Sequence, residues 1–259
     1  MSDWPQGYGL HVLDEVDSTL NEAARLAPTL QGPLWILAHH QTAARGRRGR
    51  SWINPQGNLA ATLVMRPSGT PDQVALRSFV AALALFDACV AVTGRADGLS
   101  LKWPNDVLLN GGKLAGILLE SSGQAGQGVS HLAIGIGVNL VEVPSADQVE
   151  TGAVRPVSLM SETGVQVDAE SFLAELAVAF AKYETQFASY GFGPIRTAWL
   201  ARAARLGDVI TARTPTTETT GTFQTVDATG NLVLNTAKGP VSIPAADIYF
   251  GGTGHASGH

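Results

Sequence analysis

Cysteine and charged residues are scarce in this sequence of 259 residues. The single cysteine, Cys89, has no partner within the chain, which excludes an internal disulfide scaffold and favours a reducing compartment. Only 15% of the residues are charged and the net charge is −5, which excludes a disordered chain and a free-standing polybasic nucleic-acid binder. With 45% hydrophobic residues, a chain of this length forms a substantial core in one or two domains.

The sequence pattern predicts neither a targeting segment nor a membrane segment. Residues 1–13 contain Asp3 and Trp4 but no basic start and no apolar run, so we expect no secretory signal and a cytoplasmic protein. The longest apolar stretch, 74–92, is interrupted by polar residues, and its bulky side chains recur at helical spacing. It predicts a buried core helix, with Cys89 as an inert buried thiol, and no membrane partner.

Common nucleotide and hydrolase fingerprints are absent as well. No P-loop pattern precedes Lys113, Gly135-Ile-Gly137 lacks the third glycine of a dinucleotide-binding turn, and no G-x-S-x-G elbow occurs. Any phosphate-binding site in this chain is therefore formed by residues outside these common motifs.

Apolar periodicity and capping residues predict a mixture of helices and strands. Thr19–Glu22 and Thr70–Gln73 both fit the capping box, Asp168 fits an N-cap, and Asn110–Gly112 fits a hairpin turn. The predicted helices cover 19–28, 74–92, a segment that follows Asp168, and 194–204, and the predicted strands cover 34–40, 59–65, 107–109, 114–119 and 132–140.

The composition changes near Leu206. The segment that follows is rich in Thr and Val, contains turn signals and has no plausible helix, which predicts a small all-β module. We therefore expect domains at 1–205 and 206–250 and a frayed tail at 251–259.

The segment Ala44–Arg50 concentrates four arginines around two glycines. Guanidinium groups bind phosphate oxygens in pairs, and glycine lets the backbone approach a ligand closely, so the segment suits a polyphosphate. A solvated basic loop or a nucleic-acid contact is the alternative. The acidity of the whole chain argues against the nucleic acid.

A second polar group surrounds the predicted hairpin. Lys102, Asn105 and Asp106 precede it, and Lys113 follows its turn. Two ammonium groups, an amide and a carboxylate can present a cation to an anionic substrate and an oxygen ligand to Mg²⁺. The alternative for Lys113 is an exposed hairpin lysine, and Trp52 fits either the core or a stacking platform.

Taken together, five segments resemble the biotin protein ligases. In order along the chain they are Asp17-Ser-Thr19, Gln41-Thr-Ala-Ala-Arg-Gly-Arg-Arg-Gly-Arg50-Ser-Trp52, Lys102-Trp-Pro-Asn-Asp106, Lys113-Leu-Ala-Gly-Ile-Leu-Leu-Glu120 and Gly135-Ile-Gly-Val-Asn139. The resemblance implies an α+β fold: a class II synthetase-like, biotin–lipoate ligase catalytic domain with a mixed sheet and flanking helices, followed by a small SH3-like all-β C-terminal domain.

The resemblance also implies a reaction in two steps. Biotin and Mg-ATP give biotinyl-5′-AMP and pyrophosphate, and the adenylate then acylates one lysine of a biotin carboxyl carrier protein. Biotin, ATP and Mg²⁺ are the implied ligands. The Ser-Thr motif begins at Ser18 and leaves no room for a DNA-binding domain, so we expect no repressor activity and no nucleic-acid partner. The resemblance is compatible with a monomer or a homodimer.

By resemblance, the site residues fall into two groups. Lys113 and Arg47 are the expected catalytic residues, because they meet the carboxylate and the α-phosphate. Trp52 is expected to stack on the adenine, Asn139 to read its edge, and Asn105 to lie near the metal. The expected biotin site comprises Ser18, Thr19, Gln41, Arg45, Gly46, Arg47, Lys113 and Gly116, and the expected ATP site comprises Arg48, Arg50, Trp52, Lys102, Asn105 and Asn139.

Two positions depart from the family pattern. Leu20 stands where the family often has asparagine, so no contact to the ureido ring is assigned to it, and Ala44 replaces a loop glycine. Two other functions remain open at this point: a lipoate ligase or octanoyltransferase, which the arginine segment disfavours, and a non-catalytic module that binds biotin or an adenylate.

Overall fold

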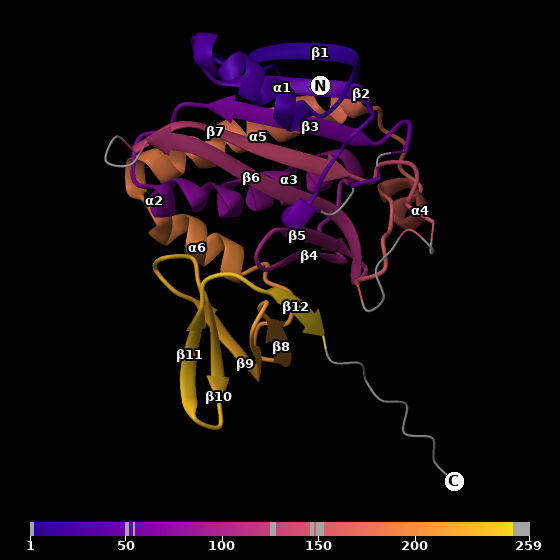
Figure 1. The fold of residues 1–259 in the computed structure, drawn as a ribbon. Helices are drawn as coiled ribbons and strands as arrows, with labels where there is room; N and C mark the ends of the chain where they lie inside the picture. Colours follow the sequence, from indigo (N-terminus) through magenta and orange to yellow (C-terminus); the bar gives the residue numbers. More distant parts are fainter. Residues whose placement is uncertain are drawn as a thin grey trace.

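A computed structural model describes residues 3–49, 52–53, 55–124, 128–145, 148 and 153–250. Figure 1 shows a large sheet with helices on both faces and a smaller sheet below it. The helices are α1 (Thr19–Leu26), α2 (Pro71–Ala75), α3 (Arg77–Thr93), α4 (Leu159–Thr163), α5 (Ala169–Tyr190) and α6 (Phe192–Leu200). The strands are β1 (Gly9–Val16), β2 (Leu34–Gln41), β3 (Leu59–Met65), β4 (Leu99–Lys102), β5 (Asp106–Leu109), β6 (Gly112–Gln124), β7 (Gly128–Val138), β8 (Val209–Arg213), β9 (Glu218–Val226), β10 (Leu232–Thr236), β11 (Gly239–Ile243) and β12 (Asp247–Phe250).

The large sheet has the strand order β1-β2-β3-β7-β6-β5-β4. Strands β1 and β2 are parallel, and the other neighbours pair antiparallel. A mixed sheet with flanking helices, together with a separate five-stranded sheet formed by β8–β12, confirms the predicted fold class. The turn between β5 and β6 has positive φ at Asn110 and Gly111, as the predicted two-residue hairpin requires.

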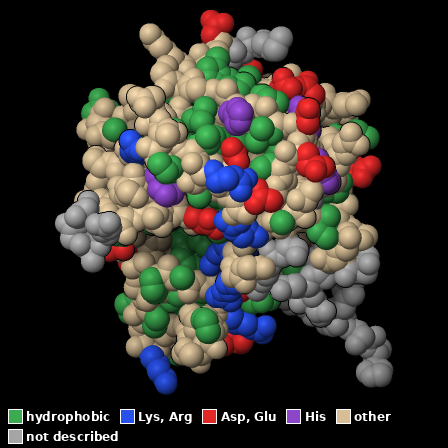
Figure 2. All heavy atoms as spheres, turned by 45° about the horizontal axis from the view of Figure 1, so that its top comes forward, with side chains coloured by type: hydrophobic (Ala, Val, Ile, Leu, Met, Phe, Trp, Pro, Cys, Tyr) green, Lys and Arg blue, Asp and Glu red, His purple; other side chains and the backbone are tan. Residues whose placement is uncertain are grey.

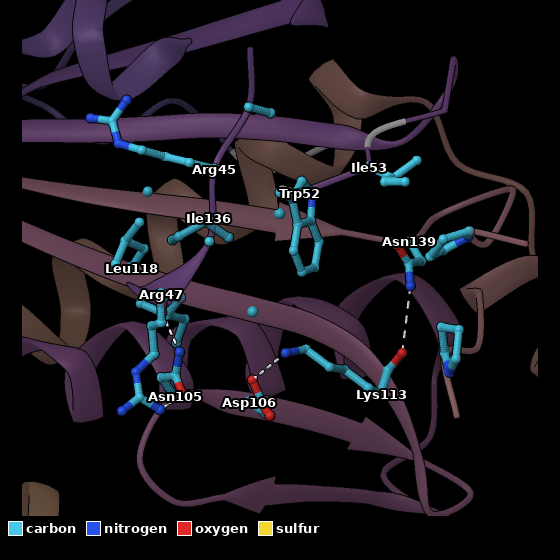
Figure 3. A pocket seen from close by; sticks show the side chains of 18 of the residues that line it. Arg45, Arg47, Trp52, Ile53, Asn105, Asp106, Lys113, Leu118, Ile136 and Asn139 are labelled. Atoms are coloured by element: carbon cyan, nitrogen blue, oxygen red, sulfur yellow. Dashed lines mark hydrogen bonds and ion pairs between the residues drawn. The ribbon is translucent and has the colours of Figure 1, made fainter. Parts of the chain in front are cut away.

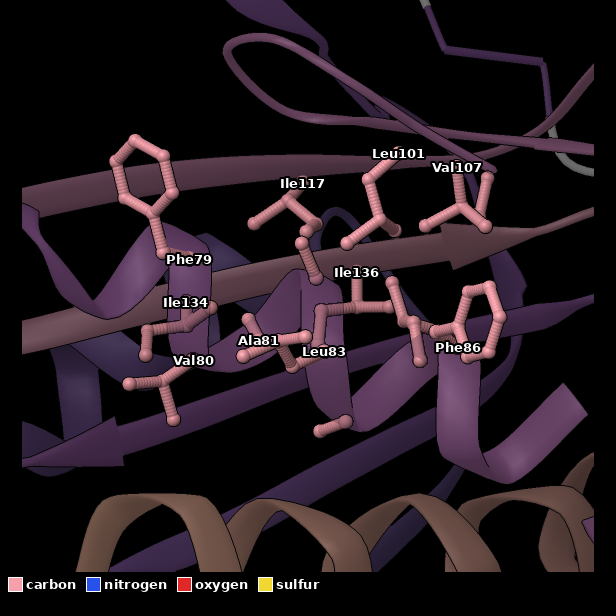
Figure 4. Close-up of a cluster of buried hydrophobic side chains, with 14 of the residues drawn as sticks. Phe79, Val80, Ala81, Leu83, Phe86, Leu101, Val107, Ile117, Ile134 and Ile136 are labelled. Carbon is pink, nitrogen blue, oxygen red and sulfur yellow. The ribbon is translucent and has the colours of Figure 1, made fainter. Parts of the chain in front are cut away.

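Helices α3 and α5 cover one face of the large sheet and form the main core with it (Figure 4). The helical region Pro71–Thr93, which contains the apolar stretch predicted as a core helix, is long and apolar enough to span a membrane. Of its most apolar 18 residues, however, 72% are buried inside the protein. Cys89 on α3 is fully buried, and burial raises the pKa of its thiol to about 12. The prediction of an inert thiol is therefore confirmed.

Helix α1 packs on the opposite face of the large sheet, against β2, β3 and β7. Strand alternation separates the two faces: Trp35 belongs to the main core, whereas its neighbour Ile36 packs with Leu20 and Ala23 of α1. Helix α1 covers only part of this face. The remainder is open beside β6 and β7.

The small sheet is joined to the rest of the chain by hydrogen bonds from side chains to its main-chain carbonyls and by a shared apolar core. Trp103 donates its indole N–H to the carbonyl of Gly230 at 3.0 Å, and Arg196 of α6 donates to the carbonyl of Val226. The buried side chains of the small sheet, such as Phe223, belong to the same apolar cluster as α3. The two sheets are therefore held in a fixed relation (Figure 1).

Several predicted boundaries need correction. The N-cap of α1 is Ser18, whose hydroxyl accepts from the Leu20 amide, because the Thr19 hydroxyl is bonded to Gln41 and Thr62 instead. The last predicted helix ends at Leu200. Strands β1 and β4 and helix α4 were not predicted, and the tail at 251–259 lies outside the described residues.

Arg77 on α3 and Glu184 on α5 form an ion pair of 2.7 Å between side chains that are 6% and 12% exposed. We predict that Arg77→Ala lowers the free energy of unfolding by about 3–5 kcal/mol, because it leaves a buried carboxylate without its partner. Arg155→Ala is the matched control, since Arg155 is 72% exposed in its pair with Glu162. Urea unfolding measures both, and equal effects would contradict the prediction.

Candidate active site

A cavity of about 490 Å³ opens on the face of the large sheet that α1 leaves uncovered. Its wall includes the start of α1, the segment 44–47, strands β5–β7 and residues 247–249 of the small sheet. Figure 2 shows Lys and Arg side chains running along the centre of this side of the molecule, beside a hollow with an apolar lining. Segments that lie far apart in sequence therefore meet here (Figure 3).

Strand register sets a row of residues beneath the cavity, and the two glycines of this row, Gly137 and Gly116, form the cavity floor. Ala60, Gly137, Gly116 and Asp106 lie opposite one another on β3, β7, β6 and β5, and Lys102 of β4 completes the row. Directly paired residues project from the same face of a sheet. Three side chains of one carbon or none therefore leave space above the floor, and the row ends in a carboxylate and an ammonium group.

Trp52 lies on this floor. A methyl group added to Gly137 would stand 2.5 Å from the Trp52 ring, so this position needs glycine while the ring stays in place, and one added to Gly116 would make a tight contact of 3.2 Å. The Lys113 ammonium lies 5.6 Å from the centre of the indole ring. The stacking interpretation of Trp52 is favoured by this geometry over a place in the core, because the ring lines the cavity.

Lys113 reaches the cavity through an irregularity in β6. Val107 pairs with Ala115 but Leu108 pairs with Lys113, so β6 carries one extra residue at Leu114. A β-bulge of this kind reverses the alternation, and Lys113 therefore projects on the same side as Gly116 instead of into the core with Ala115. The expectation of an ammonium in a cleft is confirmed, and the hairpin-surface alternative is wrong.

Asp106 binds both lysines. Its Oδ1 lies 2.7 Å from the Lys113 Nζ and its Oδ2 lies 3.4 Å from the Lys102 Nζ. Burial alone would raise the pKa of Asp106, but the two ammonium groups outweigh burial and hold that pKa below its usual value. Burial lowers the pKa of Lys102, against the attraction of Asp106. The carboxylate is thus ionised at neutral pH and keeps two neighbouring cations in place.

One end of the cavity is a network of hydroxyl, amide and charged groups. The Gln41 Oε1 accepts from the Thr19 amide at 2.8 Å and from its hydroxyl at 3.2 Å, and Thr62 donates to the same hydroxyl. Nearby, Arg45 donates through its Nε and Nη2 to the two carboxylate oxygens of Glu120, at 2.9 and 2.8 Å. This end presents fixed polar groups beside the apolar side chain of Leu20.

At the other end, Arg47 and Arg48 face the small sheet. Arg47 donates to the Asn105 Oδ1 at 3.3 Å, and its Nη1 lies 3.7 Å from the Asp247 carboxylate. Arg48 pairs with the same carboxylate at 2.7 Å. Asp247 therefore joins the arginine segment to the small sheet.

Asn105 and Asn139 already bond to the main chain. The Asn105 Nδ2 donates to the Ile117 carbonyl at 2.6 Å, and the Asn139 Nδ2 donates to the Val157 carbonyl at 3.1 Å. Only the Oδ1 of Asn139 is left to read an adenine edge in this conformation. Among the described residues, no group of three His, Cys, Asp or Glu side chains is suited to hold a metal ion.

The structure brings together most of the residues singled out from the sequence. Arg48 is not among the residues of the cavity wall, and Arg50 lies outside the described residues. Sequence reasoning left Thr62 and Asp247 unnoticed and quoted Glu120 without a role. It offered the Asp106 carboxylate as an oxygen ligand for Mg²⁺, whereas in the structure this carboxylate pairs with Lys102 and Lys113. The predicted residues found on the cavity wall are Ser18, Thr19, Gln41, Arg45, Gly46, Arg47, Trp52, Lys102, Asn105, Lys113, Gly116 and Asn139.

Comparisons with known proteins agree with this picture. The model of the Biotin/lipoate A/B protein ligase family matches residues 12–139, and that of the Biotin protein ligase C terminal domain matches residues 206–251. The chain is 57% identical to a biotin–[acetyl-CoA-carboxylase] ligase of Paracoccus denitrificans, and the match covers 93% of this chain and 100% of that protein. It is 32% identical to the bifunctional ligase/repressor BirA of Bacillus spizizenii, over 94% of this chain and 75% of that protein.

Among solved structures, the fold is similar to a biotin protein ligase from Aquifex aeolicus in complex with biotin and ATP. The TM-score is 0.78 at 25% sequence identity, and the match covers 93% of this chain and 97% of that one. The similarity spans both sheets.

We predict that Asp106→Asn lowers the free energy of unfolding by about 3–5 kcal/mol at neutral pH, because two cations then face each other without their counter-charge. The pKa of Lys102, already lowered by burial, falls further in the variant. A lysine whose pKa is lower in the folded than in the unfolded protein destabilises the fold at every pH below the folded-state pKa, and this cost disappears as pH rises to the unfolded-state pKa. The loss of free energy of unfolding in the variant should therefore shrink as pH rises. Urea unfolding between neutral and alkaline pH measures this, with the exposed Asp208→Asn as control. A deficit that does not change with pH would contradict the prediction.

Proposed function

The chain belongs to the biotin/lipoate A/B protein ligase family, and from this membership we propose that it is an ATP-dependent biotin–[acetyl-CoA-carboxylase] ligase. The observation that carries the proposal is the convergence of the arginine segment and the hairpin lysine on one cavity with a glycine floor. The enzyme joins biotin to ATP in this cavity and then transfers the biotinyl group to a lysine of a biotin carboxyl carrier protein.

The charges of the cavity suit two anionic substrates. Its described wall holds four cationic side chains, Arg45, Arg47, Lys102 and Lys113, and two carboxylates, Asp106 and Asp247, which leaves a local charge of +2 (4 − 2). The whole chain carries −5. Positive charge is thus concentrated where the acid group of biotin and the phosphates of ATP must approach each other.

Biotin lies between the polar end of the cavity at Thr19 and the Trp52 ring, which covers the glycines of the floor. Leu118 supplies apolar surface for its ring and chain, and Thr19 and Gln41 supply fixed hydrogen-bonding groups at the far end. Arg45 is neutralised by Glu120 and therefore shapes the wall of this end, whereas Arg47 reaches toward the carboxylate.

Adenylate formation requires cations near the reacting atoms. A carboxylate oxygen of biotin attacks the α-phosphorus, the bond to the β-phosphate oxygen breaks, and pyrophosphate leaves with the electron pair. Lys113 and Arg47 neutralise charge that builds on the phosphates, and each such contact contributes about 2.7–4 kcal/mol to the transition state. Because Asp106 and Asn105 hold these two groups before substrate binds, little reorganisation is needed.

Magnesium enters as part of the nucleotide substrate, Mg-ATP. The described residues form no carboxylate cage, and the Asn105 Oδ1 accepts from a guanidinium group. Phosphate oxygens and water therefore supply most ligands of the ion, and a contact from Asn105 remains a prediction.

In the second step, the neutral amine of the acceptor lysine attacks the acyl carbon of biotinyl-5′-AMP. The bond from that carbon to the phosphate oxygen breaks, an amide forms, AMP leaves and the amine releases its proton. The carrier must approach the open side of the cavity.

Incubation with biotin, Mg-ATP and an apo carrier domain tests the function. Biotinylated carrier, with pyrophosphate released, is the expected result. Transfer of lipoate in place of biotin would identify the other branch of the family, and biotin binding without pyrophosphate release would identify a non-catalytic module. Either result would contradict the proposal.

We predict that Lys113→Ala and Arg47→Ala each lower the rate of adenylate formation by about a hundred- to a thousandfold. Lys102 still neutralises Asp106 in the first variant, so the melting temperature should change little. Biotin-dependent exchange between ATP and pyrophosphate measures the rate. Lys182→Ala, an exposed lysine paired with Asp87, is the control with an unchanged rate. If either variant unfolds, the assignment of that residue to the active site is wrong.

A further inference from the structure

Asp247 connects the small sheet to the arginine segment. It is the first residue of β12, its side chain is 18% exposed, and its two carboxylate oxygens lie 3.7 Å from Arg47 and 2.7 Å from Arg48. The carbonyl of Ala246, the preceding residue, accepts from the Arg47 Nη2 at 3.5 Å. Two consecutive arginines are thus bound by two consecutive residues at the start of β12.

The backbone of the arginine segment needs such support. Arg48 has φ 57° and ψ 28°, a left-handed conformation that a residue with a side chain rarely adopts, and Gly49 follows with φ 72°. With this conformation at Arg48, the side chains of Arg47 and Arg48 both lie near the Asp247 carboxylate. A surrounding structure that fixes the residue must offset its strain.

The segment is held at its other end by a different carboxylate. Arg45 makes two hydrogen bonds to Glu120 of β6 and one to the Asn21 Oδ1, and the Trp52 amide donates to the Ala44 carbonyl at 3.0 Å. The biotin end is therefore held by the large sheet and by α1. The end with Arg47 and Arg48 is held by Asp247 together with the bond from Arg47 to Asn105.

We propose that Asp247 is a positioning residue through which the small sheet holds Arg47 and Arg48 ready for the nucleotide phosphates. The inference rests on the proposed function and adds to it a residue through which the small sheet acts on both arginines. Asp247 acts through the arginines: it orients them before ATP arrives, and the polyphosphate then takes the place of its carboxylate as their counter-charge.

This role predicts a split between the two substrates. Asp247→Ala should raise the KM for ATP about tenfold, the scale expected for a lost charge-assisted hydrogen bond. The KM for biotin should rise less than the KM for ATP, because Arg47 keeps its hydrogen bond to Asn105 and Arg45 remains paired with Glu120. Asp247→Glu should restore part of the affinity for ATP. Exchange between ATP and pyrophosphate measures all three, and Asp208→Asn, which removes an acid of an exposed ion pair in the same region, should match the wild type.

A double-mutant cycle separates positioning from a general loss of charge. Arg48→Gln should raise the KM for ATP by a similar factor, and Asp247→Ala combined with Arg48→Gln should be little worse than either alone. Additive effects would overturn the proposal. A lower KM for ATP in Asp247→Ala would also overturn it, because the carboxylate would then compete with ATP and not position its ligands.

One measurement does not depend on the enzymatic reaction. Without ligands, trypsin should cleave Asp247→Ala after Arg47 or Arg48 faster than it cleaves wild type or Asp208→Asn, at an unchanged melting temperature. Equal cleavage would overturn the positioning role even in an active enzyme. If the wild type shows no biotin-dependent exchange, the proposed function fails while the cleavage result still decides whether Asp247 holds the segment.

Discussion

The cavity depends on one buried carboxylate between two ammonium groups. Two lysines that are partly or largely withdrawn from water repel each other and lose hydration, so they are stable as neighbours only with a counter-charge. Asp106 supplies this charge, and its depressed pKa keeps it ionised. The same arrangement leaves Lys113 30% exposed to the cavity while Lys102 stays 10% exposed behind it. One lysine can therefore meet a ligand while the other stabilises its partner.

Strand register places this triad next to a surface that can accept an apolar ligand. The row from Ala60 to Lys102 crosses five strands, and it passes from small residues to charged ones within the width of the sheet. A substrate with an apolar body and an acid group matches such a gradient. The helices on the opposite face keep the sheet rigid, so the register, and with it the distance between floor and charges, is fixed by the main core.

Local sequence patterns predicted helices and strands well where the signal lies within one short segment of the chain. The capping box at Thr70 and the N-cap at Asp168 are confirmed, and the apolar stretch that contains Cys89 is the central helix of the core. Local patterns failed where a tertiary partner decides. Thr19 lost its predicted capping role to Gln41, and β1 has Leu10 and Val12 exposed at the sheet edge, so it lacks the clear alternation of a half-buried strand. The motifs located the cavity, but the bulge that turns Lys113 toward it and the link from Asp247, 199 residues from Arg48, have no local signature.

The buried thiol described above has a practical consequence. Because Cys89 is enclosed in the core and its sulfur stays protonated at neutral pH, we expect that maleimide reagents do not label the native protein. A cysteine introduced on the arginine segment and another on the rim of the small sheet would be the only two attachment points for dyes. The separation of these two parts could then be followed in single molecules during turnover, without first removing a native residue.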